Sequence, residues 1–184
     1  VGYDTALNTA MEMIDRIRDT TESDDRCSVV EVMGRRCGDI ALNTGVAVGA
    51  IATLVPEIPY DFEKDVIARI RMAQSTGKKH FIVVVAEGVG HTQEITERIQ
   101  KETGIESRAT VLGHVQRGGS PTLQDRVVAS RMGYHAVELL SKGIGNRVVA
   151  MKGQDIVDFD ITEALEMPRV FDENLYRISA VLSI

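Results

Sequence analysis

Three short polar segments of this 184-residue sequence carry residue types that bind phosphate or sugar hydroxyl groups. The segment 33–36 combines Gly34, which permits close backbone approach, with arginine guanidinium groups suited to phosphate. The segment 114–119 places His114, Gln116 and Arg117 before a Gly-Gly turn, where their donors could converge on an anionic or hydroxyl-rich ligand. Glu87 follows an apolar run and could accept hydrogen bonds from a ligand hydroxyl group.

Each segment also has a purely structural explanation. Arginines beside a glycine turn are often only solvated, and a lone histidine in a loop is more often structural than ligating. The cluster of donors in 114–117 favours a ligand site. A carboxylate at a strand end can simply pair with a nearby arginine, and spacing alone leaves both explanations of Glu87 open.

The sequence pattern around these residues predicts an α/β fold, with a mostly parallel sheet covered by helices on both faces. The elements of this fold must position the three polar segments. Strands apolar on both faces alternate with amphipathic segments, as such a sheet requires. The expected strands are 28–32, 52–55, 80–85, 109–112 and 147–151. The expected helices are 4–18 with Asp4 as N-cap, a small-residue helix ending at 47, 63–74, 92–102, 122–140, 161–166 and 173–182.

Strand direction places the three polar segments at one end of that sheet. Ligands bind beyond the carboxyl ends of parallel strands, and loops 33–38, 87–91 and 113–120 all follow expected strands. Arg26 and Arg108 precede strands, so we expect them at the opposite end, where they could serve the same site only from a second subunit.

Composition narrows the class of protein. The hydrophobic fraction of 43% and charged fraction of 26% indicate a packed, soluble domain. The net charge of −6 disfavours nucleic-acid and membrane-surface roles, which need a cationic field. Cys27 and Cys37 form neither a zinc pattern nor a disulfide framework, which fits a reducing compartment. Stretch 40–55 is too short and too interrupted to span a membrane.

Familiar catalytic signatures are absent from the sequence. It contains no GxxxxGK[ST] loop, no strand-linked GxGxxG, no HExxH, no nucleophile elbow, and no carboxylate cluster typical of a Mg²⁺–ATP site. No metal ligands are therefore assigned. The sequence begins at Val1 without an initiator Met or signal peptide and reads like part of something longer. From the residues alone we predict an anion-binding α/β domain without a recognisable set of catalytic residues.

The motifs, taken together and in order, resemble those of bacterial ATP-dependent 6-phosphofructokinases. The resemblance is carried by segments 29–35, 84–88 and 110–121 with Asp125 and Arg126, and by segment 2–6, which is similar to the segment after the family's catalytic loop. It spans essentially the whole sequence and corresponds to the carboxyl-terminal part of the enzyme, mainly the fructose-6-phosphate-binding domain. The family's ATP-binding glycine-rich loop and catalytic aspartate would lie upstream.

This resemblance implies a phosphofructokinase-like fold, in which segment 160–184 packs on the missing nucleotide domain. It also implies transfer of the γ-phosphoryl group of ATP, with Mg²⁺, to the 1-hydroxyl of D-fructose 6-phosphate in glycolysis. The implied enzyme is a cytoplasmic homotetramer. Residues 1–184 alone are expected to be inactive, because the aspartate base and the nucleotide loops are missing.

The resemblance also implies roles for individual residues. The fructose-6-phosphate site would comprise Met33, Gly34, Arg35, Glu87, His114 and Arg117 of one subunit, with Arg26 and Arg108 of a neighbour. His114, Arg117 and the two borrowed arginines would hold the 6-phosphate. Glu87 and the Met33–Gly34 backbone would orient sugar hydroxyls. Arg35 would stabilise charge on the transferring phosphoryl group.

An allosteric site, where ADP activates and phosphoenolpyruvate inhibits, is implied at Arg18, Gly49, Lys78 and His80. Here the sequence departs from the family. Ile51 stands where a glutamate holds the effector's Mg²⁺, and Thr76 stands where an arginine lies beside the effector phosphate. Since an alkyl group cannot ligate Mg²⁺, we expect weak or altered activation by ADP.

Two alternatives remain open at this level. A pyrophosphate-dependent phosphofructokinase shares the sugar-phosphate loops, and the choice of donor depends mainly on residues upstream of Val1. A non-catalytic sugar-phosphate-binding or regulatory subunit would also carry these loops without the catalytic ones.

Overall fold

The protein is described by a computed structural model covering residues 2–20 and 25–183. The chain divides into a larger unit, residues 6–118 with 171–183, and a smaller unit, residues 2–5 with 119–170. No helix in these described ranges is both long and apolar enough to cross a membrane.

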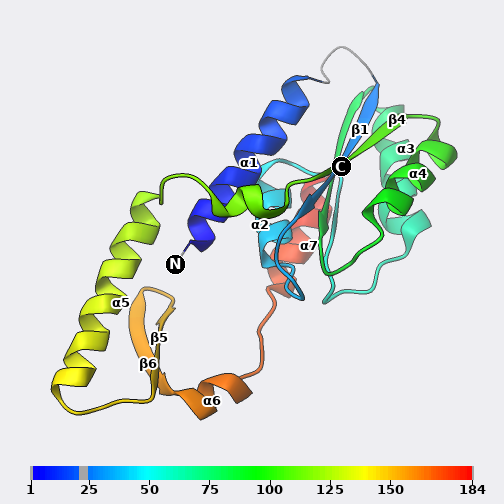
Figure 1. Cartoon of the computed structure of the whole chain (residues 1–184). Helices are drawn as coiled ribbons and strands as arrows, with labels where there is room; N and C mark the ends of the chain where they lie inside the picture. The colour runs from blue at the N-terminus through cyan, green and yellow to red at the C-terminus, as the bar shows by residue number, and fades with distance from the viewer. Residues whose placement is uncertain (1, 21–24, 184) are drawn as a thin grey trace. The chain divides into compact units, whose positions relative to one another are not determined.

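A four-stranded parallel sheet forms the centre of the larger unit (Figure 1). Its strands, in spatial order, are β2 (Ala52–Leu54), β3 (His80–Ala86), β1 (Arg26–Val32) and β4 (Glu106–Val111). The inner strands β1 and β3 are buried on both faces, which explains their nearly continuous apolar sequence. Val32 pairs with Ala86 and Glu31 with Val111, so β1, β3 and β4 end at the same edge.

Helices cover both faces of this sheet (Figure 1). On one face lie α1 (Tyr3–Asp19, from its second turn), α2 (Asp39–Ala47) and α7 (Glu173–Leu182). On the other lie η1 (Glu63–Ile67), α3 (Ala68–Ser75) and α4 (Thr92–Thr103). Successive strand residues point to opposite faces, so Val29 packs in the core under α3 and α4, and Val30 packs in the core under α1 and α2.

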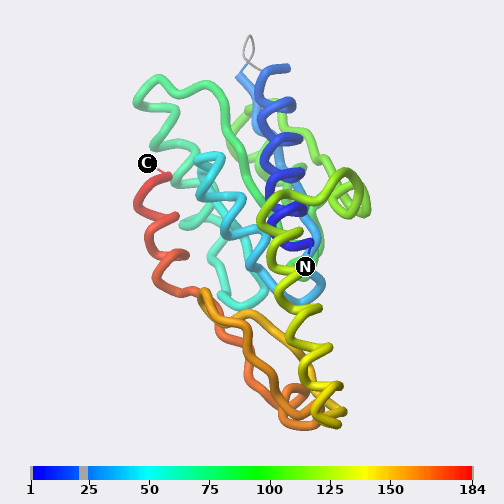
Figure 2. Tube along the Cα trace, turned by 90° about the vertical axis from the view of Figure 1, so that its left-hand side faces the viewer, coloured from blue at the N-terminus to red at the C-terminus, as the bar shows by residue number. Residues whose placement is uncertain are grey.

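The smaller unit contains α5 (Leu123–Ser141), the antiparallel strands β5 (Arg147–Lys152) and β6 (Asp155–Asp160), and α6 (Ile161–Glu166). Helix α5 runs beside the β5–β6 hairpin (Figure 2). The Asp158 carboxylate lies 2.6 Å from His135 Nε2 on α5 and 2.6 Å from Arg147 on β5. These contacts hold the pKa of Asp158 below its usual value, with the His135 hydrogen bond as the largest cause.

Little apolar surface is buried in this smaller unit. Asp125 is the only buried residue among its described residues, whereas Leu123 on α5 is 79% exposed and Leu140 is 67% exposed. A two-stranded hairpin is marginal without a packed apolar face. The unit therefore presents an apolar helix surface that its own described residues leave uncovered.

The predicted α/β fold with a mostly parallel sheet is confirmed. Four local predictions need correction. Asp4 lies in the first turn of α1, which begins at Tyr3, and is not its N-cap. Segment 63–74 begins with the π-helical turn η1, and β6 was not predicted. Arg108 lies inside β4, because that strand begins two residues earlier, at Glu106.

The expectation that segment 160–184 packs on a nucleotide domain stays a prediction. Within the larger unit, α7 contacts α2 and β2. Arg69 on α3 donates to Ser183 Oγ at 2.9 Å and so ties α3 to the end of α7.

Candidate functional site

Three loops meet where β1, β3 and β4 end. Backbone hydrogen bonds continue past the strands: Glu87 N donates to Val32 O at 2.9 Å, and Leu112 N donates to Glu31 O at 3.1 Å. The loop after β4 forms the 3₁₀ turn η2 (Gly113–Arg117). The predicted convergence of loops 33–38, 87–91 and 113–120 is therefore realised within the larger unit, which contains residues 113–118 of the last loop.

Side chains from two of these loops hold the third. Glu87 Oε1 accepts from Gly34 N at 3.1 Å and from Arg35 N, and Gln116 Oε1 accepts from Met33 N at 2.8 Å. Three consecutive backbone N–H groups of the β1 loop are thus bound by its neighbours. The loop needs such support because Gly34 and Arg35 have positive φ values of 154° and 54°.

Gly88 allows the β3 loop to approach the β1 loop closely. A Cβ atom at this position would lie 2.2 Å from the Arg35 carbonyl oxygen, so any side chain would force the two loops apart. The glycine places the Glu87 carboxylate within hydrogen-bond reach of the Gly34 and Arg35 amides.

The charged groups at this edge remain exposed. His114 and Arg117 lie on η2, and Arg35 lies on the β1 loop. Gln116, whose donors were expected to converge on a ligand with theirs, is instead only 1% exposed. The structure therefore separates two functions in η2, in which His114 and Arg117 face solvent and Gln116 braces the loops.

Arg26 lies at the opposite end of the strands, as strand direction predicted, whereas Arg108 lies inside β4, near that end. Glu106 joins them: Arg26 lies 3.3 Å and Arg108 2.7 Å from its carboxylate oxygens. The hydrogen bond from Arg108 is the main reason that the pKa of Glu106 lies below its usual value. The two arginines thus form one cluster, apart from the six other residues assigned to the sugar phosphate.

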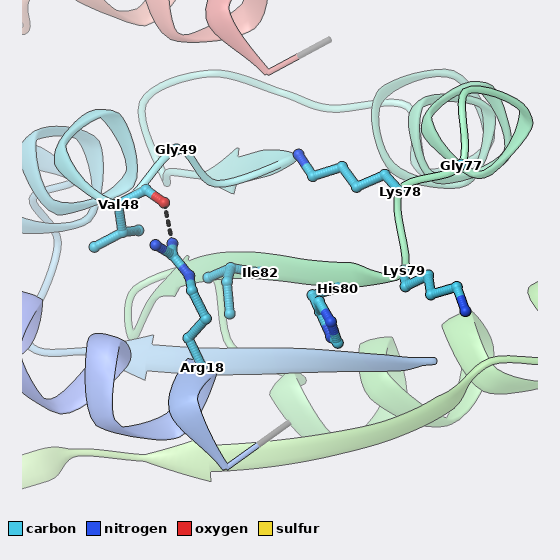
Figure 3. Close-up of a pocket in the computed structure, with 8 residues that line it drawn as sticks. All are labelled: Arg18, Val48, Gly49, Gly77, Lys78, Lys79, His80 and Ile82. Atoms are coloured by element: carbon cyan, nitrogen blue, oxygen red, sulfur yellow. Dashed lines mark hydrogen bonds between the residues drawn. The ribbon is translucent and has the colours of Figure 1, made fainter. Parts of the chain in front are cut away.

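A second pocket, of about 550 Å³, brings the four residues assigned to the effector together (Figure 3). Arg18 of α1 donates to the Val48 carbonyl oxygen beside Gly49. Lys78 and His80 come from the segment that enters β3. The lining is Arg18, Val48, Gly49, Gly77, Lys78, Lys79, His80 and Ile82.

The two residues that depart from the family pattern lie outside that lining. Ile51 is 1% exposed and packs in the core under α3. Thr76 Oγ1 donates to Ala73 O at 2.8 Å and caps the end of α3. Lys79 is a further cation of the pocket, and sequence reasoning missed it although it lies between two assigned residues.

A buried carboxylate joins two of the recognised motifs in the smaller unit. Asp125 accepts from Gly2 N at 2.7 Å, from Thr5 N at 2.8 Å and from Thr5 Oγ1. Burial acts to raise the pKa of Asp125, but the bonds from Thr5 and Gly2 outweigh it, so the pKa is lowered. Both motifs were recognised in the sequence, but their contact was not predicted. No local pattern indicates a hydrogen bond between Thr5 and Asp125, which lie 120 residues apart.

Neither cysteine forms part of a metal or disulfide site in the described ranges. Burial raises the pKa of the Cys27 thiol to about 12. Cys37 is half-buried, its Sγ donates to Asp39 Oδ2 at 2.9 Å, and burial is the main reason that its pKa is raised. Both thiols are therefore protonated near neutral pH.

Mg²⁺, which the resemblance implies, finds no ligand set in the described residues. Residues 2–20 and 25–183 contain no group of three or more His, Cys, Asp or Glu side chains able to hold a metal ion.

The fold and these loops define a class: α/β proteins whose strand-end loops meet at the carboxyl edge of a parallel sheet. The phosphofructokinase family model matches residues 1–140, and the chain belongs to this family.

Individual relatives agree with that assignment. The chain is 54% identical over 184 residues to an ATP-dependent 6-phosphofructokinase of Bacillus cytotoxicus, and 52% identical over 183 residues to one of Clostridium botulinum. In each case the match covers 100% of this chain but 57% of the relative, so the chain spans little more than half of their length. A phosphofructokinase structure from Saccharomyces cerevisiae matches 97% of this chain and 25% of its own, with a TM-score of 0.83 and 29% identity.

Proposed function

We propose that this chain forms the sugar-phosphate-binding part of an ATP-dependent 6-phosphofructokinase. Such an enzyme transfers the γ-phosphoryl group of ATP to the 1-hydroxyl of D-fructose 6-phosphate and gives fructose 1,6-bisphosphate. The observation that carries the proposal is the meeting of the β1, β3 and β4 loops, which carry the family motifs at one edge of the sheet. The relatives' name supports ATP as donor.

The exposed cations supply phosphate recognition. His114 and Arg117 offer donors from one turn, and charge-assisted hydrogen bonds to a phosphate dianion are about twice as strong as neutral ones. Arg35, on the neighbouring loop, is assigned to the charge that develops on the transferring phosphoryl group. Glu87 is half-buried, and its carboxylate is suited to accept from a sugar hydroxyl group.

Arg26 and Arg108 act across a subunit boundary in this proposal. Arg26 is the first residue of β1 and Arg108 is the third residue of β4, and Glu106 holds them together. Because β1 and β4 are rigidly paired, the two side chains cannot reach the carboxyl edge of their own sheet. A homotetramer, in which a neighbour presents them to the sugar phosphate, is the assembly we propose.

We assign the binding of ATP and Mg²⁺, and the aspartate base, to the part of the relatives' polypeptide that lies outside the length matched by this chain. This chain's own residues bind and orient the sugar phosphate and stabilise charge. The location we propose is the cytoplasm, where glycolysis takes place.

The pocket around Arg18, Lys78 and His80 is proposed as the effector site. Three cations, Arg18, Lys78 and Lys79, suit the phosphates of a nucleoside diphosphate. Among the described residues, no carboxylate lines this pocket, which supports weak activation by MgADP. Strong ADP activation of the full-length enzyme, abolished by Lys78→Ala, would contradict this part of the proposal.

The test of the main proposal is a steady-state assay of the full-length polypeptide with fructose 6-phosphate and either ATP or pyrophosphate. We expect turnover with ATP, and Arg117→Ala should raise the KM for fructose 6-phosphate by about tenfold or more, the loss of one charge-assisted contact. Arg131→Ala is the matched control, because Arg131 binds the Gln154 carbonyl oxygen in the smaller unit.

Turnover with pyrophosphate alone would refute the donor assignment. Turnover with neither donor would refute the kinase assignment. Residues 1–184 by themselves should show no turnover, and measurable activity of that fragment would show that the catalytic groups have been placed wrongly.

A further inference from the structure

Gln116 differs from its neighbours in the turn η2 in being buried. It is 1% exposed, whereas His114, Val115 and Arg117 are exposed. Burying a primary amide is costly unless its polar atoms are hydrogen-bonded. A polar side chain therefore occupies a core position in a segment whose other side chains face solvent.

One hydrogen bond explains why a glutamine is buried at position 116. Its Oε1 accepts from Met33 N at 2.8 Å and so connects η2 to the β1 loop across 83 positions of sequence. The backbone N–H of Met33 can only donate, which fixes the orientation of the amide. Gln116 Nε2 has no hydrogen-bond partner among the described residues, and an apolar residue of similar length would avoid that cost. The accepting oxygen is therefore the reason for an amide here.

Glu87 and Gln116 brace the β1 loop in different ways. Glu87 is a half-buried carboxylate, and solvent or a ligand hydroxyl group can exchange with its bonds to Gly34 and Arg35. Gln116 is shielded, so its bond to Met33 stays in place when a ligand arrives. Gln116 can therefore keep a constant spacing between the turn η2 and the β1 loop.

We propose that Gln116 is a positioning residue for sugar-phosphate recognition, acting by holding the Met33 amide rather than by touching the ligand. This inference rests on the proposed function. It predicts that breaking the bond impairs fructose 6-phosphate and leaves the nucleotide unaffected, because only the sugar-phosphate loops are connected by it.

The test is Gln116→Met in the full-length enzyme, which keeps the side-chain length and removes the accepting oxygen. We expect the KM for fructose 6-phosphate to rise about tenfold, the effect of leaving one buried donor unpaired. The KM for ATP should stay within about twofold. Thr103→Val is the matched control, since Thr103 Oγ1 accepts from Ile105 N at 3.2 Å at the far end of α4.

A backbone ester at residue 33, introduced with the α-hydroxy analogue of methionine, removes the donor of the same bond and leaves Gln116 in place. If the inference holds, the ester and Gln116→Met raise the same KM, and the double variant is no worse than either alone. An unchanged KM for fructose 6-phosphate in the folded variants, or an equal loss for both substrates, would overturn it. Absence of wild-type turnover would instead overturn the proposed function.

Discussion

Gly88→Ala tests the close approach of the β3 loop to the β1 loop. The new Cβ would lie 2.2 Å from the Arg35 carbonyl oxygen and 3.2 Å from Pro56 Cγ. The first of these atoms belongs to the backbone and cannot rotate away. Since nonbonded atoms separate to about 3.5 Å, one loop must move by about 1 Å.

That displacement acts on both stability and binding. Forcing an extra methyl group into a packed contact costs about 1–3 kcal/mol, which lowers the Tm of a domain of this size by about 2–10 °C. The same shift moves Glu87 away from the Gly34 and Arg35 amides. A misplacement of about 1 Å can cost up to about 100-fold at a site, so we expect affinity for fructose 6-phosphate to fall by about 10- to 100-fold.

The assay is calorimetric titration of the full-length enzyme with fructose 6-phosphate, together with thermal unfolding. Gly133→Ala is the matched control, because a Cβ there meets nothing within 4 Å in the middle of α5. The control should keep wild-type affinity and gain about 0.5–1 kcal/mol of stability. If Gly88→Ala binds the sugar phosphate as tightly as the control, the close approach of the loops is not required for binding.

Three further predictions concern groups with shifted pKa values and the effector pocket. Asp125→Asn should lower stability by about 1–3 kcal/mol at pH 7. The folded pKa of Asp125 is lowered, so this contribution is present above the unfolded pKa of about 3.9 and is lost as the pH falls through the folded value. Urea titrations at pH 7 and pH 3 should show the difference shrinking in acid, and a constant difference would contradict the role of the carboxylate. A thiol reagent at pH 8 should label Cys37 but reach Cys27 only on unfolding, as mass spectrometry of the labelled peptides would show. Lys78→Ala should weaken ADP binding at least fivefold by calorimetry, and unchanged binding would place the effector elsewhere.

The sheet and its loops could be predicted because their signals are local. Apolar runs such as 80–86 indicate buried parallel strands, and strand direction alone placed Glu87 and Arg26 at opposite ends. The strand β6 was missed because its three unevenly spaced aspartates, Asp155, Asp158 and Asp160, are typical of an irregular segment. It pairs only with β5, and that pairing depends on the turn at Gly153.

Contacts between distant segments were not predictable. The burial of Gln116 depends on its hydrogen bond from Met33, and the hydrogen bonds at Asp125 depend on Thr5. In each case an oxygen of a polar side chain accepts from a backbone N–H group that folding brings close. Residue type and spacing identify the loops of a site, but which side chains face solvent is decided by tertiary packing.

Strand β3 runs from the pocket around Arg18 to the edge of the sheet where the three loops meet. His80, its first residue, lines that pocket, and Glu87 follows its last residue at that edge. Between them Phe81–Ala86 are buried, with β1 paired along the whole strand and β2 along part of it. An extended strand can neither stretch nor compress appreciably, and sliding it by one residue would turn every side chain to the wrong face. A displacement at His80 is therefore transmitted along β3 without a change in the length of the strand. The sheet must move as one body for either end of the strand to influence the other.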